Sequence, residues 1–219
     1  KSYIGELSGK PKEKESWWAL IRGVRGVLRQ HYGRVALNFG EPIELTPLLD
    51  AASPDWRSFS GAADAKPDWL NGLLDQVGEK ILVNINRATD VNPVNLLALA
   101  ILSTPKHAMA EADLLAQLEL VKALLTTLPY SDRVTVTPLA PADIIAYGER
   151  MQAIRRIAHP LGDVLVCEGK TAVLLSYFRN NVLHLFATAA WVAACFLNNR
   201  RMARATIVRL GRMIYPFIQ

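Results

Sequence analysis

Basic side chains that could hold a phosphate group occur at two places in the sequence. The first is a polar loop that carries Lys10, Lys12 and Lys14 just ahead of a predicted helix. Ammonium groups there could bind a phosphate, because the helix N-terminus also attracts anions through its dipole and its free N–H groups. A charged loop of this kind is, however, usually only solvated.

The second place lies in residues 174–197, which contain no Gly or Pro and are rich in Ala, Leu and Val. This composition predicts one long, mostly buried helix with a polar notch at Arg179, Asn180, Asn181 and His184. Buried polar groups have to be hydrogen-bonded. The notch either ties loops onto the helix or faces a ligand, and both interpretations stay open.

The histidines do not form a recognisable catalytic pair. The closest approaches to a His, four residues and an Asp are His107 with Asp113, which is one residue too long, and His159 with Asp163, which is one too short. The sequence shows no nucleophile elbow, phosphate-binding loop, dinucleotide fingerprint or metal-ligand spacing. We therefore predict no catalytic residue, no metal and no cofactor within the chain.

Composition indicates a globular protein with an acidic partner. The chain has 219 residues, 51% of them hydrophobic, and a formal net charge of +5. The positive charge fits phosphate-bearing metabolites, anionic lipid headgroups or nucleic acid equally well. Cys167 and Cys195 lie in apolar surroundings and are predicted to be reduced core residues of a cytosolic protein. The absence of an initial Met and of a signal peptide suggests a piece of a longer protein.

The first part of the chain predicts an α/β arrangement. Ser16 caps a helix over residues 17–32, and a short strand follows at residues 34–39. After a short helix and a surface excursion, residues 69–88 have the apolar period of an amphipathic helix. The domain boundary is expected at about residue 90, dividing the chain into residues 1–90 and 91–219.

The second part predicts a mainly α-helical domain with one β-hairpin. Helices are expected at residues 110–128, 141–158 and 203–217, besides the long one described above. The hairpin is expected at residues 162–174, with its turn at Glu168-Gly169-Lys170.

A winged-helix module has a similar order of elements, but its reading helix would be residues 110–128. That helix carries Glu111, Asp113 and Glu119 against Lys122 alone. Phosphate repulsion argues against DNA contact through it, so no nucleic-acid partner is expected.

Four motifs in collinear order resemble one known family. They are Tyr3-x-x-Glu6-Leu7-x-Gly9-x-x-Lys12-Glu13-Lys14-Glu15-Ser16, Asn38-Phe39-Gly40-Glu41-Pro42, Pro54-Asp55-Trp56 and Tyr177-x-Arg179-Asn180-Asn181-x-x-His184. Together they are similar to the large bacterial membrane-bound glycerol-3-phosphate 1-O-acyltransferases over essentially the whole chain.

The resemblance implies an enzyme that transfers a fatty acyl group from acyl-CoA or acyl carrier protein to glycerol 3-phosphate, at the cytoplasmic face of the inner membrane. In that family the catalytic His and Asp lie upstream of the matched segment, so this segment alone is expected to be inactive. Residues 1–90 would end the α/β acyltransferase domain, with residues 34–39 at the edge of its sheet. Residues 91–219 would begin a helical C-terminal domain. Lys12, Lys14 and Arg179 are the candidates for binding the phosphate groups of substrates.

A non-catalytic docking domain is the main alternative. The predicted helix over residues 17–32 carries two tryptophans and three arginines that could hold it on a membrane surface. These residues are Trp17, Trp18, Arg22, Arg25 and Arg29.

Overall fold

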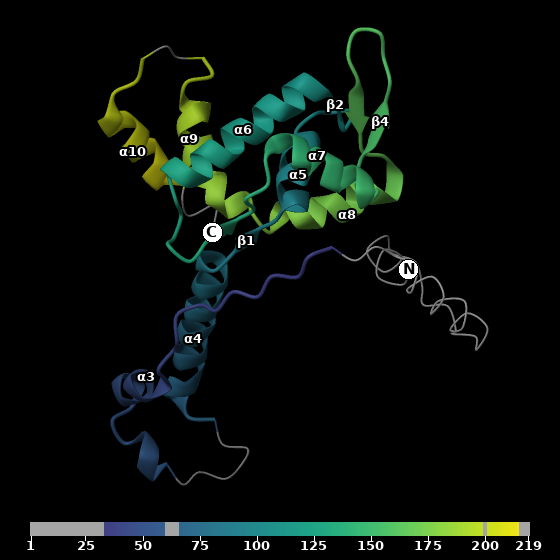
Figure 1. Ribbon diagram of the computed structural model, residues 1–219. Helices are drawn as coiled ribbons and strands as arrows, with labels where there is room; N and C mark the ends of the chain where they lie inside the picture. Colours follow the sequence, from purple (N-terminus) through teal and green to yellow (C-terminus); the bar gives the residue numbers. More distant parts are fainter. Residues whose placement is uncertain (1–32, 60–65, 199–200, 215–219) are drawn as a thin grey trace, which may run out of the picture. The chain divides into compact units, whose positions relative to one another are not determined.

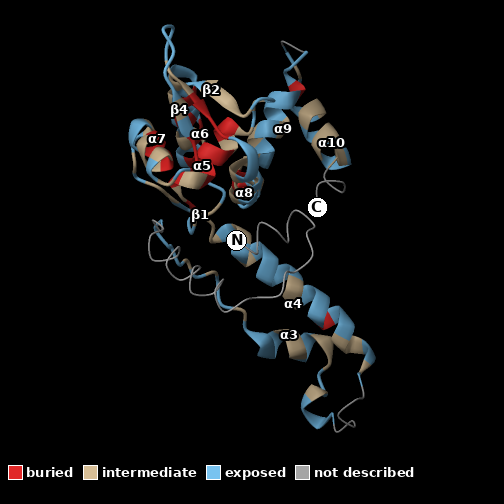
Figure 2. Cartoon of the chain, turned by 90° about the vertical axis from the view of Figure 1, so that its right-hand side faces the viewer, coloured by how far each residue is buried: buried red, intermediate tan, exposed pale blue. Residues whose placement is uncertain are grey.

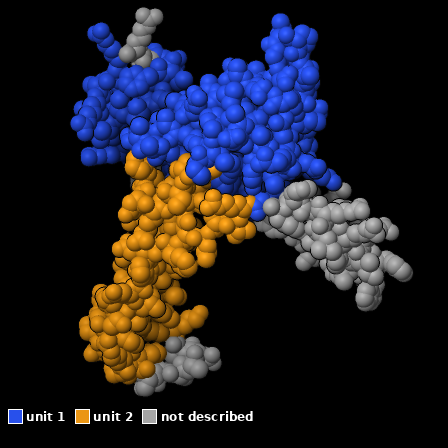
Figure 3. Space-filling view, viewed as in Figure 1, with its two compact units in different colours: residues 1–33, 92–128, 138–219 blue, residues 34–91, 129–137 orange. Residues whose placement is uncertain are grey.

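The computed structural model describes residues 33–59, 66–198 and 201–214 (Figure 1). The predicted helix over residues 17–32, and Lys12 and Lys14 ahead of it, lie outside the described residues. The chain divides into two compact units (Figure 3). The small unit contains residues 34–91 and 129–137, and the large unit contains residues 1–33, 92–128 and 138–219. The described fold is mixed α/β and mostly helical, as predicted.

The small unit is built on the long helix α4 (Asp68–Arg87), which confirms the helix predicted at residues 69–88. Helix α3 (Leu45–Ala52) packs against α4 and is followed by the 3-10 turn η1 (Trp56–Ser58). Two short strands, β1 (Asp90–Val91) and β3 (Thr135–Val136), pair in parallel.

Helix α4 buries little of its predicted apolar stripe. Leu73 is buried, whereas Leu74, Ile81 and Ile85 are 57%, 45% and 60% exposed. Figure 2 shows most of α4 as exposed. Apolar surface of this extent is typical of a region that contacts another protein segment or a membrane.

Residues 34–39 do not form the predicted strand. They have no regular secondary structure, and Val35, Leu37 and Phe39 are 92%, 77% and 77% exposed. Asn38 holds the segment in place, because its Nδ2 atom donates to the carbonyl of Ala88 at 3.0 Å and to Oγ1 of Thr135 at 2.9 Å. The prediction was wrong for the described chain. A strand needs backbone hydrogen bonds to a neighbouring strand, and the side-chain hydrogen bonds of Asn38 do not supply them.

The core of the large unit is helix α5 (Pro93–Ile101). It is apolar on nearly every side, and Leu96, Leu97, Ala98 and Ile101 have no exposed surface. A helix that is hydrophobic all round has to be surrounded by protein. Helices α6 (Glu111–Thr127), α7 (Pro141–Arg150) and α8 (Gly169–Asn180) pack against it.

An antiparallel sheet joins β2 (Ala108–Ala110), β5 (Val164–Val166) and β4 (Arg155–Ile157), in that order. The β-hairpin is therefore formed by β4 and β5, and its position was predicted wrongly. The predicted turn at Gly169 instead begins α8, so residues 171–174 are helical. Short apolar runs such as this one suit a strand and a buried helix equally well.

Helix α7 ends earlier than predicted, which leaves room for β4. Gln152 has a φ of +54°, and the backbone N–H of Ala153 donates back to the carbonyl of Gly148 at 2.9 Å. A left-handed residue after the last turn is a common helix end, but it is usually Gly or Asn. Because residue 152 is a glutamine, the sequence gives no indication that the helix ends here.

The long helix predicted over residues 174–197 is broken into three pieces. Helix α8 ends at Asn180, a 3-10 turn η2 (Leu183–Phe186) follows, and α9 (Ala187–Cys195) continues the chain. Two consecutive asparagines favour a helix end over a helix interior. The last helix, α10 (Arg204–Ile214), packs on α9 within the predicted range.

Candidate functional site

Arg179 takes its position from the junction between α5 and α8. The side chain of Asn92 caps α5 by accepting from the backbone N–H groups of Val94 and Asn95, and Asn95 Oδ1 accepts from Asn92 N–H at 3.0 Å. The other end of the Asn95 amide, Nδ2, donates to the carbonyl of Phe178 at 2.7 Å. The residue next to Arg179 is thereby tied to the start of α5.

The guanidinium group of Arg179 turns to its neighbour. Its Nε and Nη2 atoms donate to Asn180 Oδ1 at 3.3 and 3.2 Å. Arg179 is half-buried and Asn180 is exposed. A guanidinium has five N–H donors, so donors remain for an anion.

The predicted buried notch is a helix end at the surface. Asn181 is exposed and occupies the C-cap of α8, while His184 is half-buried in the η2 turn. The residues of the notch therefore do not share one helix face. Lys12 and Lys14, the other two predicted phosphate-binding residues, lie outside the described residues.

Sequence reasoning missed a charged cluster within the described residues, which surrounds Arg156 on β4. Its Nη1 and Nη2 atoms bind both carboxylate oxygens of Glu111, at 2.5 and 3.0 Å. Its Nε atom donates to Glu149 at 2.9 Å, and Nη1 also reaches Asp163 at 3.1 Å. Arg156, Glu111 and Glu149 belong to three separate elements and Asp163 lies in the loop of the hairpin, so no local pattern could have revealed the whole cluster.

The Arg156 cluster is suited to holding the unit together. The hydrogen bonds that Arg156 donates to Glu111, and then to Glu149 and Asp163, raise the pKa of its guanidinium above the usual range. One guanidinium surrounded by three carboxylates leaves a net negative charge, which repels phosphate. The cluster therefore joins the N-terminus of α6, the end of α7 and the hairpin.

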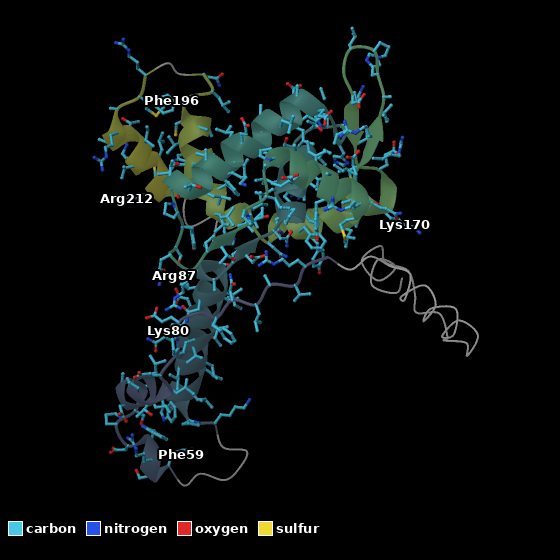
Figure 4. The ribbon with its side chains drawn as sticks, viewed as in Figure 1. Phe59, Lys80, Arg87, Lys170, Phe196 and Arg212 are labelled. Carbon is cyan, nitrogen blue, oxygen red and sulfur yellow. The ribbon has the colours of Figure 1, made fainter. Side chains whose placement is uncertain are left out.

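A groove of about 260 Å³ lies on the small unit. The residues that line it come from the end of α4 and from two loops, and they are Glu41, Asn84, Arg87, Tyr130, Ser131, Asp132 and Arg133. Figure 4 labels Arg87 at the end of α4. Its lining contains two arginines and two carboxylates, so the charge of the groove gives no preference for an anion.

A second groove, of about 430 Å³, lies beside the hairpin of the large unit, and Cys167 contributes to its lining. Burial, and secondarily the charge of Glu168, raise the pKa of the Cys167 thiol. A thiol with a raised pKa is a poor nucleophile because little of it is ionised near neutral pH.

Residues 33–59, 66–198 and 201–214 contain no group of His, Cys, Asp and Glu side chains that could hold a metal ion. None of the helices in these ranges is long and apolar enough to cross a bilayer.

The described chain is a mainly helical α/β region. Ion pairs and hydrogen bonds between side chains of distant segments connect its helices and strands. The family model described as the glycerol-3-phosphate acyltransferase C-terminal region matches residues 3–219. The chain belongs to this family, which confirms the resemblance found in the sequence.

Relatives match along the whole chain. A glycerol-3-phosphate acyltransferase of Xanthomonas axonopodis pv. citri (strain 306) is 59% identical over 218 residues, covering 100% of this chain and 25% of the relative. The proteins of that name from Xylella fastidiosa (strain M12) and Pseudomonas fluorescens (strain SBW25) are 56% and 42% identical, with 100% of this chain and 25% and 26% of the relatives covered. The chain thus spans about a quarter of the length of the curated relatives it matches.

Proposed function

We propose that this chain is the C-terminal part of an enzyme that transfers a fatty acyl group from acyl-CoA or acyl carrier protein to the first hydroxyl of glycerol 3-phosphate. The observation that carries the proposal is the match with glycerol-3-phosphate acyltransferases over 100% of the chain, at 59% identity in the Xanthomonas relative. The product, 1-acyl-glycerol 3-phosphate, is a precursor of phospholipids.

The reaction is assigned to the parent protein. A histidine paired with an aspartate, upstream of this segment, removes the proton of the glycerol hydroxyl as its oxygen attacks the thioester carbonyl. The C–O ester bond forms, the C–S bond breaks, and the thiolate leaves and takes up a proton. We assign no residue of this chain to these steps.

Residues 1–90 complete the acyltransferase domain in this proposal, and residues 91–219 belong to the helical C-terminal domain. Val35, Leu37 and Phe39 lie in an exposed segment without regular secondary structure, so they offer apolar surface for packing. The exposed apolar residues of α4 supply further surface for such packing. Residues 34–39 and α4 are therefore proposed to pack against the upstream part of the acyltransferase domain.

Lys12, Lys14 and Arg179 are proposed to contact the phosphate groups of glycerol 3-phosphate or of the acyl donor. The donors that Arg179 retains beyond its bonds to Asn180 support its part in this proposal. The parent enzyme is placed at the cytoplasmic face of the inner membrane, where the net charge of +5 favours anionic headgroups.

Acyl transfer measured in two forms tests the proposal. One form is the present chain, and the other is the same chain extended upstream to include a His, four residues and an Asp. Activity in the extended form alone is the expected result. Activity in the short form would mean that catalytic residues lie within these 219 residues, and no activity in either form would favour a docking domain.

A further inference from the structure

The charged side chains in the last part of the chain are all basic. Residues 169–219 hold seven Lys and Arg side chains and no Asp or Glu, whereas residues 1–168 hold eighteen basic and twenty acidic ones. The positive net charge of the protein therefore originates in this segment. Such asymmetry points to a negatively charged partner.

Helix α10 within this segment has two distinct faces. On one face, Leu210, Gly211 and Ile214 are half-buried, and Gly211 lies so close to Trp191 of α9 that an added Cβ atom would be 3.1 Å from the indole nitrogen. This face holds α10 on α9, as Figure 1 also shows. The residues of the opposite face are exposed in the part of the chain that the structure describes.

The outer face of α10 combines charge with apolar surface. A shallow groove runs along it, lined by Arg204, Ala205, Val208, Arg209, Arg212 and Met213. Val208 is 46% exposed and Met213 is 63% exposed. These residues follow helical spacing, so arginines and apolar side chains are interleaved on one surface.

The three arginines of this face are not used by the fold. Among the described residues, Arg204, Arg209 and Arg212 have no ion-pair or hydrogen-bond partner. They differ in this from Arg156, whose guanidinium binds three carboxylates. An exposed guanidinium without a carboxylate is available to bind a phosphate in bidentate fashion.

We propose that the outer face of α10 docks on the surface of an anionic phospholipid bilayer. Arg204, Arg209 and Arg212 would bind lipid phosphates while Val208 and Met213 enter the boundary between headgroups and acyl chains. Phe196 and Leu197, in the turn after α9, are also exposed, at 40% and 80% (Figure 4 labels Phe196 and Arg212). The inference rests on the proposed function, because it gives the membrane contact of that enzyme a location.

Interleaved apolar residues distinguish a bilayer from a nucleic acid as the partner. A nucleic-acid backbone is bound by charge and offers no apolar layer for Val208 and Met213. A bilayer binds both kinds of side chain at once. Replacing the apolar residues of this face should therefore weaken binding, and replacing its arginines should weaken binding too.

Flotation of the 219-residue chain with vesicles of phosphatidylcholine, with and without 30 mol% phosphatidylglycerol, tests the proposal. The triple variant Arg204→Gln, Arg209→Gln, Arg212→Gln should bind the anionic vesicles about 100-fold more weakly, at about fivefold for each arginine. The variant Val208→Ser, Met213→Ser should bind about tenfold more weakly. Circular dichroism establishes that each variant is folded.

The control removes the same charge elsewhere, with Lys80→Gln, Arg87→Gln and Arg133→Gln in the small unit, and should change binding less than about threefold. Equal weakening by both triple variants would overturn the proposal, as would no binding of the unsubstituted chain to anionic vesicles. Displacement of the chain from vesicles by duplex DNA, with no effect of Val208→Ser, Met213→Ser, would also overturn it and indicate a nucleic-acid partner. Flotation measures membrane binding and needs no acyl donor. Acyl transfer by the extended form can be measured separately in detergent, so failure of the membrane proposal is distinguishable from failure of the proposed function.

Discussion

The Nδ2 atom of Asn95 donates a 2.7 Å hydrogen bond to the backbone carbonyl of Phe178, which joins the first turn of α5 to the last turn of α8. Asn95 is the one buried polar side chain among the described residues, at 2% exposure. Both ends of its amide are used, because Oδ1 accepts from the backbone of Asn92. The bond links the core helix with the helix end that carries Arg179.

Substitution of Asn95 should destabilise the large unit in a way that depends on the atom removed. Asn95→Ala leaves buried partners unsatisfied and should lower the free energy of unfolding by about 1–3 kcal/mol. Asn95→Asp keeps the oxygen that faces Asn92 but places a carboxylate oxygen against the Phe178 carbonyl. At pH 7 the Asn95→Asp variant should lose more free energy of unfolding than Asn95→Ala, because it buries a charge.

Urea unfolding of these two variants at pH 7 and pH 5 measures the effect. Burial raises the folded-state pKa of the introduced carboxyl above its unfolded value, so protonation favours the folded state. The Asn95→Asp variant should therefore recover stability as the pH falls, while Asn95→Ala follows the unsubstituted chain. A pH-independent loss for Asn95→Asp would contradict the bond to Phe178.

Arg156 and its neighbour Arg155 form a matched pair on one strand. Arg156 is 32% exposed and binds three carboxylates, while Arg155 is 61% exposed and, among the described residues, binds only Glu168. Arg156→Ala should lower the free energy of unfolding by about 1–2 kcal/mol, less than for a fully buried pair because solvent screens the site. Arg155→Ala should cost less than about 0.5 kcal/mol.

Arg156→Lys keeps the positive charge but lacks the planar guanidinium that binds two carboxylate oxygens at once. It should therefore recover part of the free energy of unfolding that Arg156→Ala loses. Thermal unfolding of the three variants gives the comparison. Equal effects at the two arginines would show that the cluster does not hold the hairpin to α6 and α7.

Cys167 should react slowly in the folded protein. Burial raises the pKa of its thiol, and the thiolate is the reactive form. In a Cys195→Ser background, iodoacetamide at pH 8 should modify the folded chain at least about 100-fold more slowly than the urea-unfolded chain. Because the folded pKa is raised, the contribution of this thiol to stability should also be lost as the pH rises through it. Modification at the unfolded rate would show that the thiol is accessible.

Arg179 should affect substrate binding in the full-length enzyme. Loss of one charge-assisted hydrogen bond to a phosphate raises the KM by about tenfold or more, so we expect this of Arg179→Ala and of Lys12→Ala. Asn180→Ala is the control, because it removes the partner of Arg179 and keeps the guanidinium. Initial rates at varied glycerol 3-phosphate and acyl-CoA give the KM values. An unchanged KM for both substrates in Arg179→Ala and Lys12→Ala would exclude these residues from the site.

Helices with a clear apolar period could be predicted from the sequence, and α4 and α6 lie where that period placed them. Elements that depend on distant partners could not be. The end of α7 depends on Gln152 in a left-handed conformation, and β4 depends on pairing with β5. Residues 34–39 show the opposite case, because a strand pattern is present without a ladder in the described chain.

The candidate site was less accessible to sequence reasoning than the fold. The Asn92-Pro93-x-Asn95 pattern does signal a capped helix start, and it could have located the α5 end of the junction. Its bond to Phe178 spans 83 residues and has no local signature. The same holds for Arg156 and Glu111, which are 45 residues apart. Family motifs, by contrast, were informative because they recur in fixed order along the chain.

The most direct test of the central claim is a chimera with the Xanthomonas axonopodis pv. citri enzyme, in which this chain replaces the segment to which it is 59% identical. Acyl transfer from acyl-CoA to glycerol 3-phosphate is measured for the chimera, the intact enzyme and the enzyme without that segment. We expect the chimera to retain kcat/KM within about tenfold of the intact enzyme, a loss of less than about 1.4 kcal/mol in transition-state binding, and the truncated enzyme to be inactive. A folded but inactive chimera, or a fully active truncated enzyme, would contradict the assignment of this chain to a glycerol-3-phosphate acyltransferase.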